Sequence, residues 1–475
     1  MGATKITAEG TGATSSKLVF TAPGVQIRQF RTPELGDSTH LMVSHGEGAL
    51  IDVQRDIDRF RTDIDAQGVR VVAVLDTHIH NDYLSGGPAL AHELGVQYVL
   101  PDEAGFEPDH RAVRDGDEIA VGSARLRALF TPGHTPHHMS YQVVVGEEVV
   151  AVLSGGCVLV GACGRTDLVS AEMTEPLARL QHRSARRIGA LPGETGIGPT
   201  HGAGSFCAAF GGPAETWTDV AAEWGRNPAL LLTESDFVTA QLAGLPAHPA
   251  YYRHMGPLNR RGAPGWPSSA LASIGPSRVD SLLSEGGVVV DARAATEFAP
   301  AHLTGSVNVE LGDSFSQYLG WLFPLDTRFA FVVDDPSEAA LVLRQCGRIG
   351  IDSLEGYLAG GMAAWKASGR PVSTLRVTDL GGLEAAWRAR RTILDVRDDS
   401  EWRGGHLPGA IHVHVPQIVG RLPELTALAG PVYIHCAAGQ RAAIAASLLQ
   451  GAGVDVVLVD DDLSAWNGRG LPLEK

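Results

Sequence analysis

THIHNDYLSGG, residues 77–87, places His78, His80 and Asp82 at alternate positions in a short polar segment. It follows the apolar run VVAVLDT (71–77), which has the length of a buried strand. Neutral imidazoles at strand ends are good ligands for zinc or iron, and two at i and i+2 in a tight loop can share one ion. The stretch therefore predicts a metal-binding loop in an α/β fold.

Strands and helices alternate around this loop. GALIDVQ (48–54) and VQYVLP (96–101) have strand length, and GGPALAHELG (86–95) and residues 171–190 are helix-like. ARLRALFTPGH and EVVAVLSGG are further strands that end in loops, as does the strand before GIGPTHGAGSF (196–206). His134 and His201 lie in these strand-end loops, so we expect chemistry where the strands end.

The C-terminal part of the chain repeats itself. GGVVVDARAATEFAPAHLTGSVNV (286–309) and RRTILDVRDDSEWRGGHLPGAIHV (390–413) share a strand, Asp-x-Arg, a Glu-aromatic pair and His-Leu-x-Gly. Further on, FAFVVDDP (329–336) corresponds to PVYIHCAAGQR (431–441). The pattern predicts two copies of one α/β unit that meet near residue 375.

Cys436 follows the strand PVYIH and precedes a helix-like segment. Such a turn directs backbone N–H groups inward, and the helix adds its positive N-terminal end, which stabilises a thiolate. We predict Cys436 and Arg441 as catalytic residues of a nucleophilic centre that accepts sulfur as a persulfide. A buried structural cysteine is the alternative. The predicted substrate cradle is the loop Ala437, Ala438, Gly439 and Gln440.

Residues 275–475 resemble the rhodanese sulfurtransferase family. The markers are Asp395-x-Arg397, Glu401-Trp402, GHLPGAIH and the six-residue loop from Cys436 to Arg441. The resemblance implies that Cys436 carries the transferable sulfur. The first copy keeps the other markers but has Asp334 near the place of the cysteine, and its segment lacks the Gly and Arg of the loop. We expect that copy to be catalytically silent, a spacer or docking surface, with Cys346 in the core.

Residues 17–250 resemble the metallo-β-lactamase fold, a four-layer αββα sandwich. TPGH, GRTDL and PTHGAGS resemble its persulfide dioxygenase branch, which is itself similar to hydroxyacylglutathione hydrolases. Two positions depart from the pattern. Tyr83 replaces a histidine that helps to bind a second metal, and Gly156 stands where the family has the aspartate that ligates iron.

These departures leave a one-metal site. The resemblance matches His78 and His134 to the two histidines that bind iron in the family. We expect His78, His80 and His134 to be the ligands of one Zn or Fe ion, with zinc favoured because a carboxylate is absent. Asp82 and His201 would then orient water or substrate. A metal-free relic is the alternative. Restoring the carboxylate by Gly156→Asp is expected to shift the site toward iron if the loop tolerates the side chain.

The chain has 475 residues, which is too long for one hydrophobic core. Of these residues, 44% are hydrophobic and 19% are charged. We predict a metallo-β-lactamase-like domain (17–250), an extended linker (251–274), a degenerate rhodanese domain (275–372) and an active one (377–475). The net charge of −16 argues against nucleic acid and anionic membranes as partners.

The N-terminal residues contain no long apolar run, so we expect neither a leader nor a membrane-spanning segment there. Five cysteines without a regular spacing favour a reducing cytoplasm. The oligomeric state is left open, a homo-oligomer included.

Three functions fit the sequence. The first is an enzyme of sulfane-sulfur metabolism, in which a persulfide dioxygenase-like domain is coupled to a sulfurtransferase that uses a low-molecular-weight thiol persulfide or thiosulfate. The second is a metal-poor sulfurtransferase whose N-terminal domain is a scaffold. The third is a glyoxalase II-like thioester hydrolase with regulatory rhodanese units. Metal content separates the second from the others, and oxygen uptake with a persulfide separates the first from the third.

Overall fold

A computed structural model of the chain describes residues 16–209, 213–266 and 270–475. Residues 1–15, in which we expect no leader, lie outside the described residues. Residues 267–269 of the predicted linker also lie outside them. The chain forms two compact units, Met1–Ser268 with Gly347–Gly350 and Ser269–Cys346 with Ile351–Lys475. None of the described helices has the length and apolar character needed to cross a membrane.

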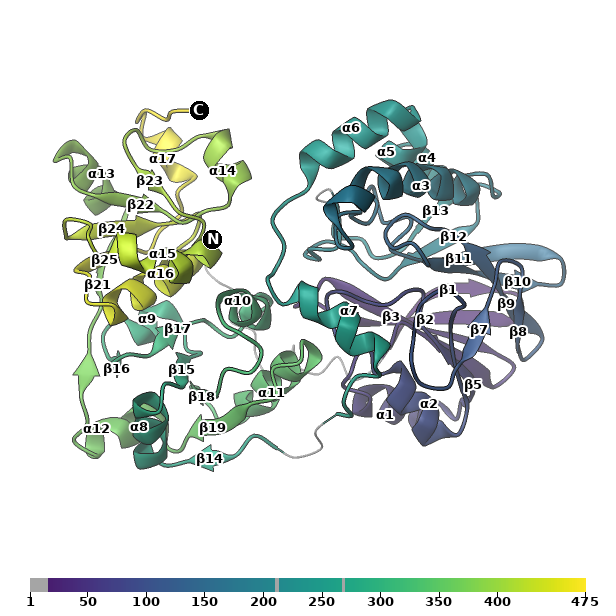
Figure 1. Cartoon of the computed structure of the whole chain (residues 1–475), viewed down its shortest axis with the longest axis horizontal. Helices are drawn as coiled ribbons and strands as arrows, with labels where there is room; N and C mark the ends of the chain where they lie inside the picture. The colour runs from purple at the N-terminus through teal and green to yellow at the C-terminus, as the bar shows by residue number, and fades with distance from the viewer. Residues whose placement is uncertain (1–15, 210–212, 267–269) are drawn as a thin grey trace. The chain divides into compact units, whose positions relative to one another are not determined.

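The first unit is built on two sheets (Figure 1). The seven-stranded sheet has the order β1-β2-β3-β4-β5-β6-β7, and the six-stranded sheet has the order β13-β12-β11-β10-β9-β8. The strands of the first sheet are β1 Lys17–Ala22, β2 Val25–Thr32, β3 Asp37–Ser44, β4 Glu47–Ile51, β5 Arg70–Leu75, β6 Gln97–Pro101 and β7 Arg111–Val113. Those of the second are β8 Glu118–Val121, β9 Ala124–Phe130, β10 Met139–Val145, β11 Glu148–Gly155, β12 Gly196–Pro199 and β13 Thr218–Asp219.

Helices cover the outer face of each sheet in this unit (Figure 1). One apolar core, which includes Ile51, Leu75 and Leu153, joins the two sheets. A second core packs α1 and α2 on the seven-stranded sheet, and a third packs α3 to α6 on the other sheet. The predicted αββα sandwich is confirmed. The helices are α1 Asp58–Gln67, α2 Gly87–Leu94, α3 Ala171–Gly189, α4 Val220–Trp224, α5 Pro228–Leu231 and α6 Glu234–Gly244.

The prediction of an extended linker from 251 to 274 is wrong for its first part. Helix α7 spans Tyr252–Arg260 and buries Tyr252, Met255 and Asn259 on one face. The Asn259 side chain donates hydrogen bonds to the carbonyls of His80 (2.9 Å) and Tyr83 (2.8 Å) and accepts one from the Ser85 amide (2.9 Å). This segment therefore belongs to the first unit and holds the loop that carries the predicted metal ligands.

The second unit contains two five-stranded sheets of one topology, β14-β19-β18-β15-β17 and β21-β25-β24-β22-β23. Every strand pair in both sheets is parallel. The same order in both confirms the repeat and the parallel sheets predicted from the sequence. The strands are β14 Ser273–Ile274, β15 Val288–Asp291, β17 Val307–Asn308, β18 Phe329–Val332 and β19 Leu354–Leu358, then β21 Arg376–Thr378, β22 Ile393–Asp395, β23 Ile411–His412, β24 Val432–His435 and β25 Val456–Val459.

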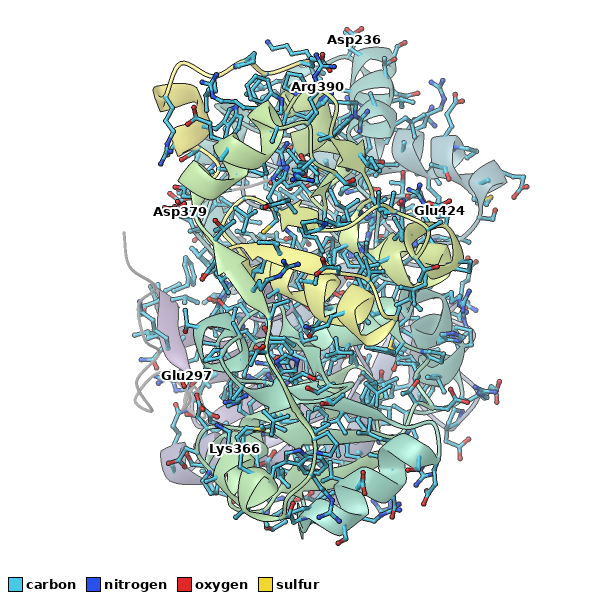
Figure 2. All side chains as sticks on the ribbon, turned by 90° about the vertical axis from the view of Figure 1, so that its left-hand side faces the viewer. Asp236, Glu297, Lys366, Asp379, Arg390 and Glu424 are labelled. Carbon is cyan, nitrogen blue, oxygen red and sulfur yellow. The ribbon has the colours of Figure 1, made fainter. Side chains whose placement is uncertain are left out.

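Helices of this unit place charged side chains outward, as Lys366 of α12 and Glu424 of α15 show in Figure 2. Asp379 is also exposed and caps α13 by accepting a hydrogen bond from the Gly382 amide (2.9 Å). The helices are α8 Pro276–Ser284, α9 Ala295–Phe298, α10 Phe315–Leu322, α11 Glu338–Arg348, α12 Gly361–Ala367, α13 Leu380–Arg388, α14 Asp399–Gly404, α15 Ile418–Leu425, α16 Gln440–Gly451 and α17 Ala465–Gly468; η2, a 3-10 turn, spans Val415–Gln417. A two-stranded antiparallel sheet pairs β16 His302–Leu303 with β20 Val372–Ser373.

Candidate functional site

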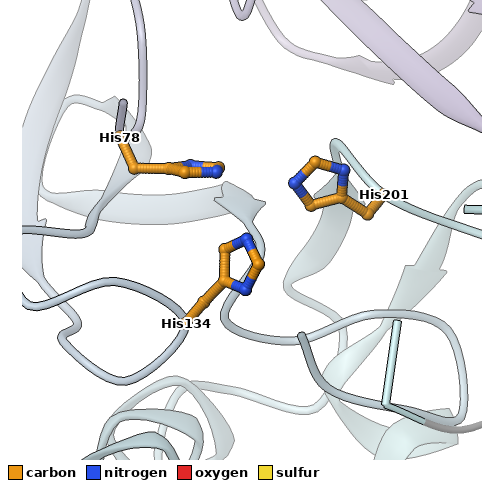
Figure 3. A group of neighbouring side chains, drawn as sticks. All are labelled: His78, His134 and His201. Carbon is orange, nitrogen blue, oxygen red and sulfur yellow. The ribbon is translucent and has the colours of Figure 1, made fainter. Parts of the chain in front are cut away.

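Three histidines from three strand ends meet inside the first unit (Figure 3). His78 follows β5, His134 follows β9 and His201 follows β12. One ligand nitrogen from each lies within 4.8 Å of the others, and the three side chains are at most 1% exposed. The rings point toward a common point in Figure 3, which is the arrangement that a single ion requires.

The opposite nitrogen of each ring is held by a hydrogen bond. His134 Nδ1 donates to the Arg165 carbonyl (2.7 Å), His201 Nδ1 donates to Asp37 Oδ1 (2.8 Å), and His78 Nδ1 lies 2.9 Å from Thr77 Oγ1. Each Nε2 is buried without a hydrogen-bond partner among the described residues. A proton fixed on Nδ1 leaves the Nε2 lone pair free, so these three residues fit a bound divalent metal.

His80 has a different environment. Its Nε2 lies 3.2 Å from Asp52 Oδ1 and 2.9 Å from the Tyr83 hydroxyl, and the Tyr83 ring stacks on it. A second group of ligand atoms, from His80, Asp82 and His201, also lies within 4.8 Å. The set His78, His80 and His134 is not one of the groups that the geometry brings together, and it stays a prediction. Reasoning from the sequence gave His201 only an orienting role, although its position after a strand matches that of His134.

Carboxylates surround His201. Asp37 lies 2.8 Å and Asp82 3.2 Å from its Nδ1, and all three side chains are buried. Burial lowers the pKa of His201, but these two aspartates outweigh that effect and raise it well above its ordinary value. At His134, by contrast, burial and the neighbouring His201 lower the pKa to about 3. Positive charge on His201 is therefore stabilised by Asp37 and Asp82. A divalent cation bound at His201 Nε2 would supply that charge in place of a proton.

The ring of His134 occupies the space of a side chain at position 156. A Cβ added to Gly156 would lie 2.3 Å from His134 Cδ2 and 2.7 Å from Cγ. The Gly156 amide donates to His138 Nε2 (2.9 Å), which fixes the backbone there. A histidine thus packs closely on this glycine, and the structure offers no room for a carboxylate side chain at position 156.

Cys436 lies at the end of β24, where the chain turns into α16. The Gly439 amide donates to its Sγ (3.1 Å), and Gly439 adopts a φ of 92°, which favours glycine. Ala437 and Gln440 are half-buried and Ala438 is exposed, so the loop is partly open to solvent. The structure brings the predicted cradle and Arg441 together on one strand–loop–helix turn.

The corresponding turn of the first copy lacks these features. Glu338 accepts hydrogen bonds from the amides of Asp334 (3.0 Å) and Asp335 (3.4 Å), so its carboxylate takes up backbone donors of the turn. Cys346 is fully buried in α11, where burial raises the pKa of its thiol. In the sequence, this contact between Glu338 and the turn was signalled only by a glutamate four residues after Asp334.

The Rhodanese-like domain family model matches residues 275–368 and 382–469. A metallo-β-lactamase from Staphylococcus aureus has a TM-score of 0.63 at 25% identity, and the alignment covers 71% of this chain and 99% of that chain. The mitochondrial persulfide dioxygenase of Homo sapiens is 31% identical over 173 residues, which cover 36% of this chain and 61% of that protein. A hydroxyacylglutathione hydrolase-like protein of Homo sapiens is 34% identical over 134 residues, which cover 28% of this chain and 43% of that protein.

The chain thus spans about half the length of the curated relatives that it matches first. These matches confirm the resemblance that the motifs indicated, with different families in the two parts of the chain. The protein joins an N-terminal domain of metallo-β-lactamase fold, homologous to persulfide dioxygenases and hydroxyacylglutathione hydrolases, to two C-terminal rhodanese-like domains.

Proposed function

We propose that the protein is an enzyme of sulfane-sulfur metabolism. Its second rhodanese-like copy transfers sulfur through Cys436, and its N-terminal domain acts on a low-molecular-weight thiol persulfide at one metal ion. The observation that carries the transfer activity is the Cys436 turn, where Sγ accepts a hydrogen bond from the Gly439 amide at the start of α16. Such a turn stabilises a thiolate and the anion that replaces it.

Sulfur transfer at this turn needs no external oxidant. The Cys436 thiolate attacks the outer sulfur of a persulfide, R–S–SH; a new S–S bond forms, the donor's S–S bond breaks, and the thiolate R–S⁻ leaves. An acceptor thiolate or sulfite then attacks the outer sulfur and restores the Cys436 thiolate. The backbone amides of the loop bind the developing negative charge.

In the N-terminal domain, His78, His134 and His201 are our proposed ligands. Three buried Nε2 atoms without partners, each opposite a fixed Nδ1 contact, support this set. A bound zinc or iron ion would supply a Lewis acid there. Asp82 lies beside His201 and is placed to orient a polar group of the substrate.

A thioester hydrolase is the second candidate for this domain. Gly156, packed under the His134 ring, leaves three imidazoles and no carboxylate from that loop, a ligand set that suits zinc. Hydrolysis at zinc needs no redox chemistry, whereas persulfide oxidation needs iron open to oxygen. This candidate shares the metal ligands with the first and differs in the reaction.

Metal analysis of the purified protein, combined with two assays on the same sample, separates the candidates. Protein loaded with zinc or with iron is tested for oxygen uptake with a thiol persulfide and for hydrolysis of a glutathione thioester. Oxygen uptake that requires iron supports the dioxygenase reaction, and thioester cleavage with zinc supports the hydrolase. Cys436→Ser is the matched control, because it removes sulfur transfer and leaves the metal ligands intact.

A further inference from the structure

The loop that follows Cys436 carries little positive charge. Its residues are Ala437, Ala438, Gly439, Gln440 and Arg441, so arginine is its single cationic residue. A cradle that binds a dianion such as thiosulfate gains most from several free cations, since each one offsets part of the charge. The charge that this loop presents therefore depends on what Arg441 contacts.

Arg441 is engaged by a carboxylate. Its Nη2 donates to Glu401 Oε1 (2.9 Å) and its Nη1 donates to Glu401 Oε2 (2.5 Å). A second carboxylate oxygen, Asp398 Oδ2, lies 3.8 Å from the same Nη1. Burial lowers the pKa of Arg441, but its hydrogen bonds to the Glu401 carboxylate and the charge of Cys436 outweigh that effect and raise it. The guanidinium is thus always charged, and its charge is compensated within the protein.

Glu401 is itself held in place at the start of α14. The amide of Asp398 donates to Glu401 Oε2 (3.2 Å), and Asp398 Oδ1 accepts from the Glu401 amide (3.0 Å), which forms a capping box. The capping box thus holds the Glu401 carboxylate in the position from which it pairs with Arg441. The pair is therefore a fixed property of the site and not a contact that a substrate easily displaces.

A further acidic side chain lies against the loop. A Cβ added at Gly439 would lie 2.2 Å from Asp460 Oδ1, so this half-buried carboxylate packs directly on the loop backbone. Arg397 pairs with Asp395 and not with Asp460: its Nε donates to both Asp395 oxygens (3.0 Å each) and its Nη2 to Oδ2 (2.6 Å). Among the described residues Asp460 forms no ion pair, and the neighbouring Asp461 adds a second carboxylate, so the surroundings of Cys436 contain unpaired negative charge.

We propose that this copy selects a thiol persulfide as its sulfur donor and discriminates against dianionic thiosulfate. The proposal rests on the sulfurtransferase function and names its substrate class. A persulfide brings at most one negative charge to the transferable sulfur, and the loop amides suffice to bind it. Thiosulfate brings two and must also release the sulfite dianion within the same acidic surroundings.

The test compares kcat/KM for glutathione persulfide and for thiosulfate on the full chain with a common acceptor thiol. In the unaltered protein we expect thiosulfate to be used at least about a hundredfold less efficiently. Glu401→Gln frees the Arg441 charge and keeps the capping box, since glutamine is accepted at this position. It should raise kcat/KM for thiosulfate at least about tenfold and leave that for the persulfide nearly unchanged.

Glu297→Gln is the matched control. Glu297 is the counterpart of Glu401 in the first copy, is exposed (Figure 2), and its replacement makes the same change in net charge. It should not change the ratio of the two donors. Ala438→Lys adds a cation on the exposed part of the loop and tests the same idea if Glu401→Gln is poorly folded; it should also raise thiosulfate use several-fold.

The outcomes are distinct. Equal use of both donors by the unaltered protein, or a donor ratio that neither Glu401→Gln nor Ala438→Lys changes, would refute the selectivity. Absence of transfer from every donor would instead refute the proposed sulfurtransferase function, and the selectivity with it.

Discussion

Replacing Gly156 with alanine should damage the histidine cluster through a single methyl group. The new Cβ would lie 2.3 Å from His134 Cδ2, whereas unstrained carbon atoms stay about 3.5–4.0 Å apart. The ring would have to retreat by more than about 1 Å. The ring is restrained, because Gly164 also packs closely on it, with an added Cβ 2.7 Å from Nδ1, and because that Nδ1 donates to the Arg165 carbonyl.

We therefore expect Gly156→Ala to lower the free energy of unfolding of the metal-free protein by about 1–3 kcal/mol, the usual cost of overpacking a core. The displaced imidazole should also lower zinc affinity at least about tenfold. Backbone strain does not contribute, because only Gly155 of this glycine pair has a positive φ, 55°. The assays are denaturant unfolding in the presence of a chelator and zinc titration with a competing chelator.

Gly265→Ala is the control. No atom lies within 4 Å of a Cβ added there, so this variant should match the unaltered protein in both assays. A Gly156→Ala protein as stable as the unaltered one, with the same zinc affinity, would refute the packing argument. The same geometry bears on Gly156→Asp: the sequence suggested that it would favour iron, but the structure predicts that it disrupts the site, because its Cβ meets the same ring.

Other predictions concern single residues. Cys436→Ser should abolish sulfur transfer in a protein that unfolds at the same denaturant concentration, and Cys346→Ala should leave transfer unchanged; transfer lost in a well-folded Cys346→Ala protein would show that the active copy has been misassigned. His201→Ala should lower zinc affinity at least about tenfold, and more than His80→Ala does, in competition titrations; the opposite order would favour the ligand set predicted from the sequence. Asn259→Ala removes three hydrogen bonds to the metal loop and should lower the free energy of unfolding by about 1–3 kcal/mol; an unchanged value in denaturant unfolding would show that α7 does not hold that loop.

Much of the fold could be predicted from the sequence. Short apolar runs gave β4, β5 and β6 to within a few residues, and the shared pattern of the repeat gave two sheets of one topology. Helix α7 was missed because Gly256 and Pro257 lie inside it and mask its buried face. Tertiary contacts through Asn259 outweigh that weak local preference.

The candidate metal site was only partly predictable. A sequence shows which histidines follow strands, but the direction of a ring depends on partners far along the chain. Asp52, which lies beside His80, follows strand β4. Asp37, which contacts His201, is the first residue of strand β3 and precedes His201 by 164 residues. The motifs suggested that position 156 lacks an aspartate of the family pattern, and only the packing shows that the His134 ring fills the space beside this glycine.

The most direct test of the proposed function is the mass of the protein after brief exposure to glutathione persulfide and removal of excess donor. Proteolysis and mass spectrometry then locate any added sulfur. We predict one additional sulfur atom on the peptide that contains Cys436, and none on those of Cys157, Cys163, Cys207 and Cys346, which are fully buried. Cyanide or an acceptor thiol should remove it. A protein that stays unmodified at Cys436, or that carries the sulfur on another cysteine, would contradict the assignment of the second rhodanese-like copy as the sulfur-transferring site.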